Sequence, residues 1–156
     1  MISYKIYKPE EIEADVLFSF IKEIDTYLTP TLSSRVNLAE YANKLSQKAY
    51  NYIARDDDKI IGISSFYFNL SPQMSYGTLL GVDKHYQKDG GIGIKLLTES
   101  IDYCKNNGSK GFGCAIRKSN KPLCKLYRIL GFSIKSEETY PNSDVTELLI
   151  EKIFTD

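Results

Sequence analysis

Three strand-like segments follow one another directly in the middle of the chain, and this succession limits the possible folds more than any other feature. Residues 50–55, 59–69 and 76–82 are rich in β-branched and aromatic side chains. An acidic turn at 56–58 separates the first two and predicts a hairpin, and Gly62 predicts a bulge or a close backbone contact. A doubly wound nucleotide-binding fold alternates strands with helices, so this succession excludes it.

Helical periodicity flanks these strands on both sides. After a short strand at 3–7, apolar residues from Ile12 to Leu28 predict a helix that opens at Pro9, and Asn37 begins a second helix with capping-box spacing. Further helices are predicted from about 92 to 107 and from Pro122 to the residue before Gly131. Strands at 111–116, 132–138 and 146–154 complete the pattern.

The resulting order is β-α-α-β-β-β-α-β-α-β-β. It predicts an α/β (α+β) fold with a mixed, mostly antiparallel central sheet of about seven strands flanked by four helices. No linker or repeat interrupts the 156 residues, so a single domain spanning 1–156 is expected.

Charge and cysteine content exclude several classes of function. Twenty basic and twenty acidic residues cancel without forming a basic stripe, so no nucleic-acid partner is expected. No apolar run approaches the roughly 20 residues that span a bilayer, so no membrane partner is expected. Cys104, Cys114 and Cys124 are odd in number and lack CxxC spacing, and His85 is the single histidine. The cysteines therefore predict free thiols, buried or half-buried, and a cytoplasmic location. The cysteines and the single histidine together predict that no metal is bound.

A glycine-rich loop joins the third of the central strands to the following helix. Gly90, Gly91 and Gly93 lie where free backbone N–H groups and the positive end of a helix dipole suit a phosphate. A P-loop needs Lys and then Ser or Thr after its last glycine, and this loop has Ile94 and Lys95 instead. A tight connection without a ligand is the alternative interpretation.

Two segments in order carry a family resemblance. Residues 80–97, LGVDKHYQKDGGIGIKLL, resemble the acetyl-CoA motif of GCN5-related N-acetyltransferases (GNAT), which is V-x-x-x-[YF] followed by [QR]-x-x-G-x-[GA] and a helix. Residues 119–132, SNKPLCKLYRILGF, resemble the N-x-x-A-x-x-L-Y-x-x-x-G-F segment of the same family. The order of elements is also similar. Gln87 lies four residues before Gly91 rather than three, and Leu123 replaces the usual alanine.

The resemblance implies the acyl-CoA N-acyltransferase fold, acetyl-CoA as co-substrate and a role for each matched residue. The pantetheine arm would lie along Leu80, Gly81 and Val82, and Asn120 would hydrogen-bond to it. Tyr127 would place its hydroxyl near the sulfur and donate a proton to the leaving thiolate, although its spacing also fits a core tyrosine. The pyrophosphate would contact the backbone of Lys88, Asp89, Gly90, Gly91, Ile92 and Gly93.

The general base and the acceptor site are less defined. The strand before the loop contains no acidic residue, Asp83 follows it, and His85 is expected to be an exposed histidine. The first two helices and the 140–144 loop would form the acceptor side, where Tyr27, Arg35 and Tyr41 are candidate contacts. Residues 31–37 resemble acetyltransferases found with surface-polysaccharide enzymes, which implies an amino-sugar acceptor.

Three functions remain open from the sequence. The first is an N-acetyltransferase acting on a primary amine of a small molecule, such as an amino sugar, by direct attack in a ternary complex. The second is a peptide or protein N-acetyltransferase, which would need an open groove. The third is a non-catalytic CoA-binding module, which the missing base allows. Either a monomer or a homodimer is expected.

Overall fold

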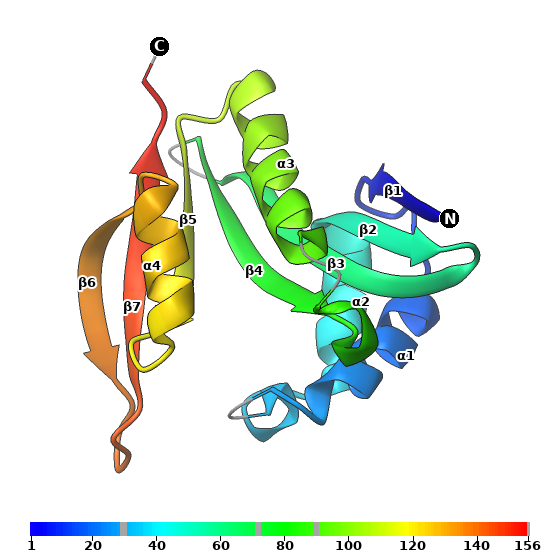
Figure 1. Ribbon diagram of the computed structural model, residues 1–156, viewed down its shortest axis with the longest axis horizontal. Coiled ribbons are helices and arrows are strands. Elements are labelled where there is room, and N and C mark those ends of the chain that lie inside the picture. Colours follow the sequence, from blue (N-terminus) through cyan, green and yellow to red (C-terminus); the bar gives the residue numbers. More distant parts are fainter. Residues whose placement is uncertain (29–30, 71–72, 89–90, 156) are drawn as a thin grey trace. The chain divides into compact units, whose positions relative to one another are not determined.

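The computed structural model describes the chain apart from residues 29–30, 71–72, 89–90 and 156 (Figure 1). The order of elements confirms the prediction. The elements are β1 (Ile2–Tyr7), α1 (Ala14–Asp25), η1 (Leu32–Ser34), α2 (Leu38–Lys48), β2 (Tyr50–Asp56), β3 (Lys59–Leu70), β4 (Met74–Val82), η2 (Lys84–Tyr86), α3 (Ile92–Asn106), β5 (Gly111–Arg117), α4 (Lys121–Ile129), β6 (Ser133–Thr139) and β7 (Thr146–Ile153).

The strands form one seven-stranded sheet in the order β1-β2-β3-β4-β5-β7-β6. The pairs β1–β2, β2–β3, β5–β7 and β6–β7 are antiparallel. β4 and β5 are parallel, with Met74–Gly77 opposite Gly111–Cys114. A parallel pair needs a long crossover, and α3 supplies it. The predicted mixed, mostly antiparallel sheet is therefore confirmed.

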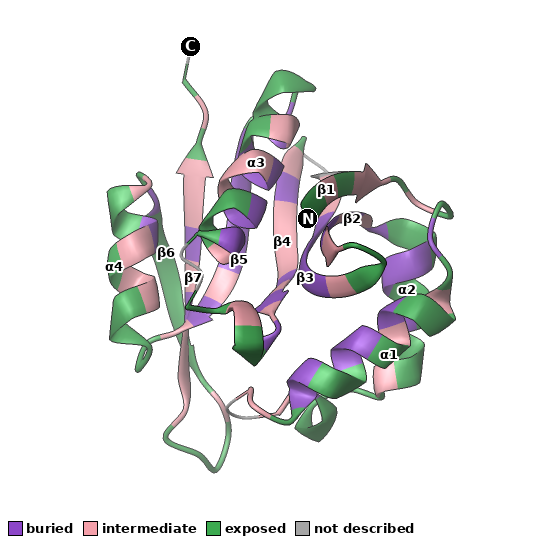
Figure 2. Ribbon diagram, turned by 45° about the vertical axis from the view of Figure 1, so that its right-hand side comes forward, coloured by how far each residue is buried: buried purple, intermediate pink, exposed green. Residues whose placement is uncertain are grey.

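The chain divides into two compact units, which are described separately. The first comprises Met1–Tyr67 and Leu79–Ser100, and the second comprises Phe68–Thr78 and Ile101–Asp156. In the first unit, α1 and α2 bury one stripe each, shown in purple in Figure 2. That stripe packs on β2 and β3 in a core that contains Leu17, Ile21, Ile24, Leu45, Ile53 and Ile63. Burial of such side chains stabilises the fold by roughly 1.5–3 kcal/mol each.

The predicted irregularity at Gly62 is present. The register of β2 against β3 shifts between Ala54 and Arg55, which leaves Ile61 as the extra residue on β3. Ile61 joins a second core cluster with Leu96 of α3. A Cβ on Gly62 would lie 2.9 Å from Leu96 Cδ1, so the helix approaches the bare backbone closely.

In the second unit, aromatic side chains fix α4 over β5. The ring of Phe132 lies 4.9 Å from that of Tyr127 at 82° and 6.3 Å from that of Phe112 at 87°. Both are edge-to-face arrangements, which aromatic rings favour. β6 is exposed along its whole length, as Figure 2 shows. Tyr127 is thus held in the core that joins α4 to the sheet.

Most helix ends follow the sequence signals. Asn37 and Asn120 cap α2 and α4, accepting hydrogen bonds from the amides of Glu40 and Leu123 at 3.0 and 3.2 Å. The prediction that the first helix opens at Pro9 was wrong, because α1 begins at Ala14. Glu10 has φ 72°, and its amide donates to the Ser46 carbonyl, so this segment forms a turn tied to α2.

Candidate active site

The described part of the glycine loop enters α3 at Gly91. Gly91 has φ +112°, a conformation that L side chains rarely adopt. Its carbonyl accepts the first hydrogen bond of α3, from the Lys95 amide at 2.7 Å. The amides of Ile92, Gly93 and Ile94 precede that bond and therefore have no acceptor within the helix. A Cβ built on Gly91 would meet nothing within 4 Å, so the backbone there is open to a ligand.

Two of the predicted phosphate contacts, Asp89 and Gly90, lie outside the described residues. Lys88 is exposed just before them, and Gly93 is half-buried, with space for a Cβ 3.5 Å from Val82 Cγ2. The described part of the loop thus combines helix amides that have no acceptor within the helix with a glycine in the left-handed region, and this combination suits an anion.

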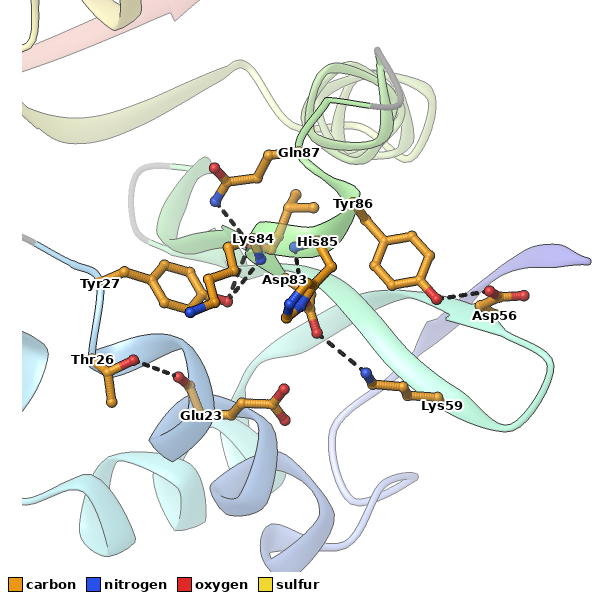
Figure 3. A network of polar contacts seen from close by, with 11 residues as sticks. Glu23, Thr26, Tyr27, Asp56, Lys59, Asp83, Lys84, His85, Tyr86 and Gln87 are labelled. Carbon is orange, nitrogen blue, oxygen red and sulfur yellow. Dashed lines mark hydrogen bonds and ion pairs between the residues drawn. The ribbon is translucent and has the colours of Figure 1, made fainter.

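A buried carboxylate organises the turn between β4 and α3 (Figure 3). Asp83 is 1% exposed, and its Oδ1 accepts from the His85 main-chain N–H at 2.8 Å and from the His85 ring Nδ1 at 3.0 Å. Its Oδ2 lies 3.5 Å from Lys59 Nζ. Burial raises the pKa of Asp83, but the hydrogen bonds from His85 and the charge of Lys59 outweigh it, so the pKa lies below its usual value. His85 is exposed, as predicted.

We expect Asp83→Asn to lower the free energy of unfolding at pH 7 by about 1.5–3 kcal/mol, because it removes charge-assisted hydrogen bonds in a buried turn. Since the folded pKa of Asp83 is lowered, its contribution is full above the unfolded pKa of about 3.9 and is lost as the pH falls through the folded pKa. Urea unfolding at pH 7, 5 and 3 should therefore show a difference in the free energy of unfolding between the wild type and Asp83→Asn that becomes smaller as the pH falls. The exposed Asp102→Asn is the control, and an equal difference at pH 3 and pH 7 would contradict the assignment.

Side chains form hydrogen bonds with the main-chain polar groups at the end of β4. The Tyr27 hydroxyl donates to the Val82 carbonyl at 3.4 Å and accepts from the Lys84 amide at 3.2 Å. Gln87 Nε2 donates to the same carbonyl at 3.0 Å (Figure 3). The pKa of Tyr27 is raised by burial, which keeps the hydroxyl protonated. Tyr27 therefore ties the end of α1 to the turn that leads into the glycine loop.

The other two predicted acceptor contacts lie nearby in the chain but in different settings. Arg35 is exposed at the end of η1, whereas Tyr41 is half-buried and packs against the first core. The α1–α2 connection is fixed by Asp25, whose Oδ1 accepts from the Ser33 amide at 3.0 Å. Of the three candidates, the structure brings Tyr27 to the β4 exit.

In the second unit, the predicted acid is buried beside a thiol. Tyr127 is 5% exposed, and burial together with the contact to Cys114 raises the pKa of its phenol. Burial likewise raises the pKa of Cys114 to about 12. Asn120 is exposed, and its Oδ1 caps α4, which leaves its amide nitrogen as the group that could donate to a ligand.

The sequence did not indicate the surroundings of two charged side chains, Asp83 and Arg117. Asp83 could have been suspected from the Asp-x-His spacing, because an Asp side chain often binds the backbone two residues on. Arg117, at the end of β5, has a buried Nη1 with no hydrogen-bond partner among the described residues. A single arginine at a strand end gives no such signal in the sequence.

The described part of the chain contains no cluster of three or more His, Cys, Asp or Glu side chains that could hold a metal ion. Within the same residues, no helix has both the length and the apolar character needed to cross a membrane.

Known proteins resemble this chain in sequence and in fold. The acetyltransferase (GNAT) family model matches residues 15–132, and no curated protein matches the chain. A GNAT-family acetyltransferase from Streptococcus pneumoniae has a TM-score of 0.75 at 18% identity, over 99% of this chain and 100% of that one. The ribosomal-protein-S18-alanine N-acetyltransferase of Escherichia coli has a TM-score of 0.74 at 16% identity, over 96% and 92%.

A third structure was solved with the co-substrate. It is described as a streptothricin acetyltransferase from Bacillus anthracis in complex with acetyl coenzyme A, with a TM-score of 0.62 at 25% identity over 80% of this chain and 72% of that one. The family match extends over most of the chain, and the solved structures share its fold. The chain therefore belongs to the GNAT family of acetyltransferases, enzymes that use acetyl-CoA as co-substrate.

Proposed function

We propose that this enzyme transfers the acetyl group of acetyl-CoA to a primary amine of a small molecule. The observation that carries the proposal is the start of α3, where Gly91 has left-handed backbone and open space beside the amides of Ile92 to Ile94, which have no acceptor within the helix. Such an arrangement fits a diphosphate, because several N–H donors and the helix dipole act on the same anion.

The rest of the cofactor would follow the strand that precedes the loop. The pantetheine arm would form hydrogen bonds with the main chain of Leu80 and Gly81. To bond to the Val82 carbonyl as well, the arm would have to displace the side chain of Gln87 or Tyr27. The carboxamide nitrogen of Asn120 would donate to the same arm. The Lys88 backbone and side chain, ahead of the loop, would complete the contacts to the diphosphate.

The reaction itself needs few groups. The neutral amine nitrogen attacks the thioester carbonyl carbon, the C–N bond forms, and a main-chain amide of Leu80 to Val82 stabilises the oxyanion. The intermediate collapses with cleavage of the C–S bond, the amine proton passes to water, and Tyr127 donates its hydroxyl proton to the departing sulfur. The products are the acetamide and free CoA, and Tyr127 regains its proton from solvent.

A buried phenol is a weak acid, so this last step depends on how basic the leaving sulfur is. Burial raises the pKa of Cys114, which contacts Tyr127, to about 12. A CoA thiolate released into the same surroundings would be destabilised in the same way, since burial disfavours any charged form. Burial would thus raise the pKa of the leaving sulfur as it raises that of the phenol, which makes the sulfur a better acceptor of the Tyr127 proton.

A small acceptor is favoured by the hydrogen bonds of Tyr27 and Asp25, in the described residues near the end of α1. The Tyr27 hydroxyl is bonded to the main chain at the β4 exit, and Asp25 holds the amide of Ser33. The main-chain N–H groups of Ser33 and Lys84 are therefore already bonded and offer a peptide backbone little to bind. Tyr27, Arg35 and Tyr41 would then contact a compact acceptor.

The test is release of free CoA thiol from acetyl-CoA with amino sugars, amino acids, polyamines and short peptides. We expect turnover with at least one small amine and none with peptides above the rate in buffer. Turnover of peptides alone would contradict the acceptor class. Tight binding of acetyl-CoA without turnover of any amine would instead indicate a CoA-binding module.

A further inference from the structure

Arg117 is the last residue of β5, and its side chain lies on the face of the sheet opposite α4. The register of β5 against β7 is continuous from Gly111 to Arg117, so successive side chains alternate regularly between the two faces. Cys114 contacts Tyr127 of α4, which places Arg117, three residues later, on the other face. This part of β5 therefore carries the proposed acid's neighbour on one face and a cation on the other.

The guanidinium of Arg117 is largely buried but incompletely paired. Its side chain is 16% exposed, and its Cζ lies 5.2 Å from the ring centroid of Tyr140, at the start of the β6–β7 loop. Nε is 4.0 Å from Glu147 Oε2, which is an ion pair too long for a hydrogen bond. Nη1 is buried and has no hydrogen-bond partner among the residues that the structure describes.

An unpaired buried N–H of a charged group is costly, so a partner is expected. Guanidinium groups match carboxylates, which accept two parallel hydrogen bonds from the planar fork. Glu147 already places one negative charge beside Arg117. A singly charged carboxylate therefore fits better than a phosphate dianion, which Glu147 would repel more strongly.

Two hydrogen bonds tie the main chain of Arg117 to the beginning of α4. The Arg117 carbonyl accepts hydrogen bonds from the main-chain N–H of Asn120 at 3.1 Å and from Cys124 Sγ at 3.5 Å. The main chain of Arg117 is thereby fixed to the first turn of α4, the helix that also carries Tyr127. In the β6–β7 loop, the main-chain N–H of Tyr140 donates to the Val145 carbonyl at 2.9 Å, and this bond closes the loop that carries the Tyr140 ring.

We propose that Arg117 binds a carboxylate of the acceptor, with Tyr140 as the surface on which the guanidinium rests, so that the preferred acceptors are amino acids. This inference rests on the proposed function, because it names the substrate class of the same reaction. Arg117 acts here as a specificity-determining residue and takes no part in proton transfer.

The experiment compares amino acids of different chain length with their carboxamides, which keep the amine and lose the carboxylate. Rates are corrected for the fraction of neutral amine. We expect kcat/KM for the best amino acid to exceed that for its carboxamide by about 10-fold or more, mainly through KM. Arg117→Gln should abolish this preference while leaving acetyl-CoA affinity unchanged. Glu147→Gln should lower KM for the amino acid.

Lys118→Gln is the matched control. It removes one positive charge from the next residue, whose ammonium group pairs with Glu137 at 3.2 Å on the exposed surface. Calorimetric titration of the CoA-bound protein with the amino acid measures binding without turnover. Thermal unfolding of each variant verifies that it is folded, and Arg117→Lys supplies a second variant that keeps the charge.

The outcomes separate the two proposals. Equal kcat/KM for acids and carboxamides, a preference that survives Arg117→Gln, or amino-sugar turnover that no carboxylate improves would overturn the role of Arg117 and leave the acetyltransferase function standing. Binding of amino acids that depends on Arg117, without turnover of any amine, would overturn the proposed function and keep the carboxylate site. Absence of calorimetric binding by amino acids would overturn the site.

Discussion

Replacing Gly91 with glutamate is expected to weaken acetyl-CoA binding by about 100-fold or more, equivalent to about 2.7 kcal/mol. The new carboxylate would stand at the N-terminus of α3, where the diphosphate is expected, and would repel it. Because Gly91 has φ +112°, any side chain also strains the backbone, by about 1–3 kcal/mol. Isothermal titration with acetyl-CoA and thermal unfolding measure the two effects separately.

Two other variants distinguish charge from strain. Gly91→Ala introduces the strain without the charge, and we expect a lower unfolding temperature with a smaller loss of affinity. Gly108→Ala is the matched control, since Gly108 follows the other end of α3, also has a positive φ of +98°, and its Cβ would likewise meet nothing within 4 Å. It should bind acetyl-CoA as the wild type does. If Gly91→Glu bound acetyl-CoA as tightly as Gly108→Ala, the diphosphate would lie elsewhere.

Tyr127→Phe is expected to lower kcat by about 100-fold while leaving the dissociation constant for acetyl-CoA unchanged. The substitution keeps the ring, and therefore the edge-to-face contact with Phe132, and removes only the hydroxyl. Steady-state kinetics with the best amine acceptor and titration with acetyl-CoA measure the two quantities. Because the pKa of Tyr127 is raised above its usual value of about 10, its deprotonation should not lower the wild-type rate below pH 10.

Tyr103→Phe provides the control for this variant. Tyr103 is a half-buried tyrosine of α3 whose ring lies edge-on to Phe68 at 6.0 Å, and the same hydroxyl deletion there should leave kcat unchanged. A Tyr127→Phe enzyme with wild-type turnover would remove Tyr127 from the role of acid. A loss of acetyl-CoA affinity equal to the loss of kcat would make it a binding residue.

The order of elements could be predicted because each depends on local signals. Asn37 and Asn120 cap helices with their own side chains. Gly108 and Gly131, whose φ values are 98° and 94°, follow the ends of helices. These interactions involve residues three or four positions apart, which a sequence displays directly. The start of α1 was mispredicted because Glu10 bonds to Ser46, a residue that is distant in sequence.

The family, the order of elements along the chain and the position of the glycine loop could be inferred from the sequence, since these follow from spacing along one chain. The environment of the charged and polar side chains emerged only from the folded chain. Folding buries Asp83 against His85 and Lys59 and raises the pKa of Tyr127 beside Cys114. It also places Arg117 next to Tyr140, with no hydrogen-bond partner for Nη1 among the described residues. Burial and pairing depend on groups that only the folded chain brings together, so periodicity and motifs carry no record of them.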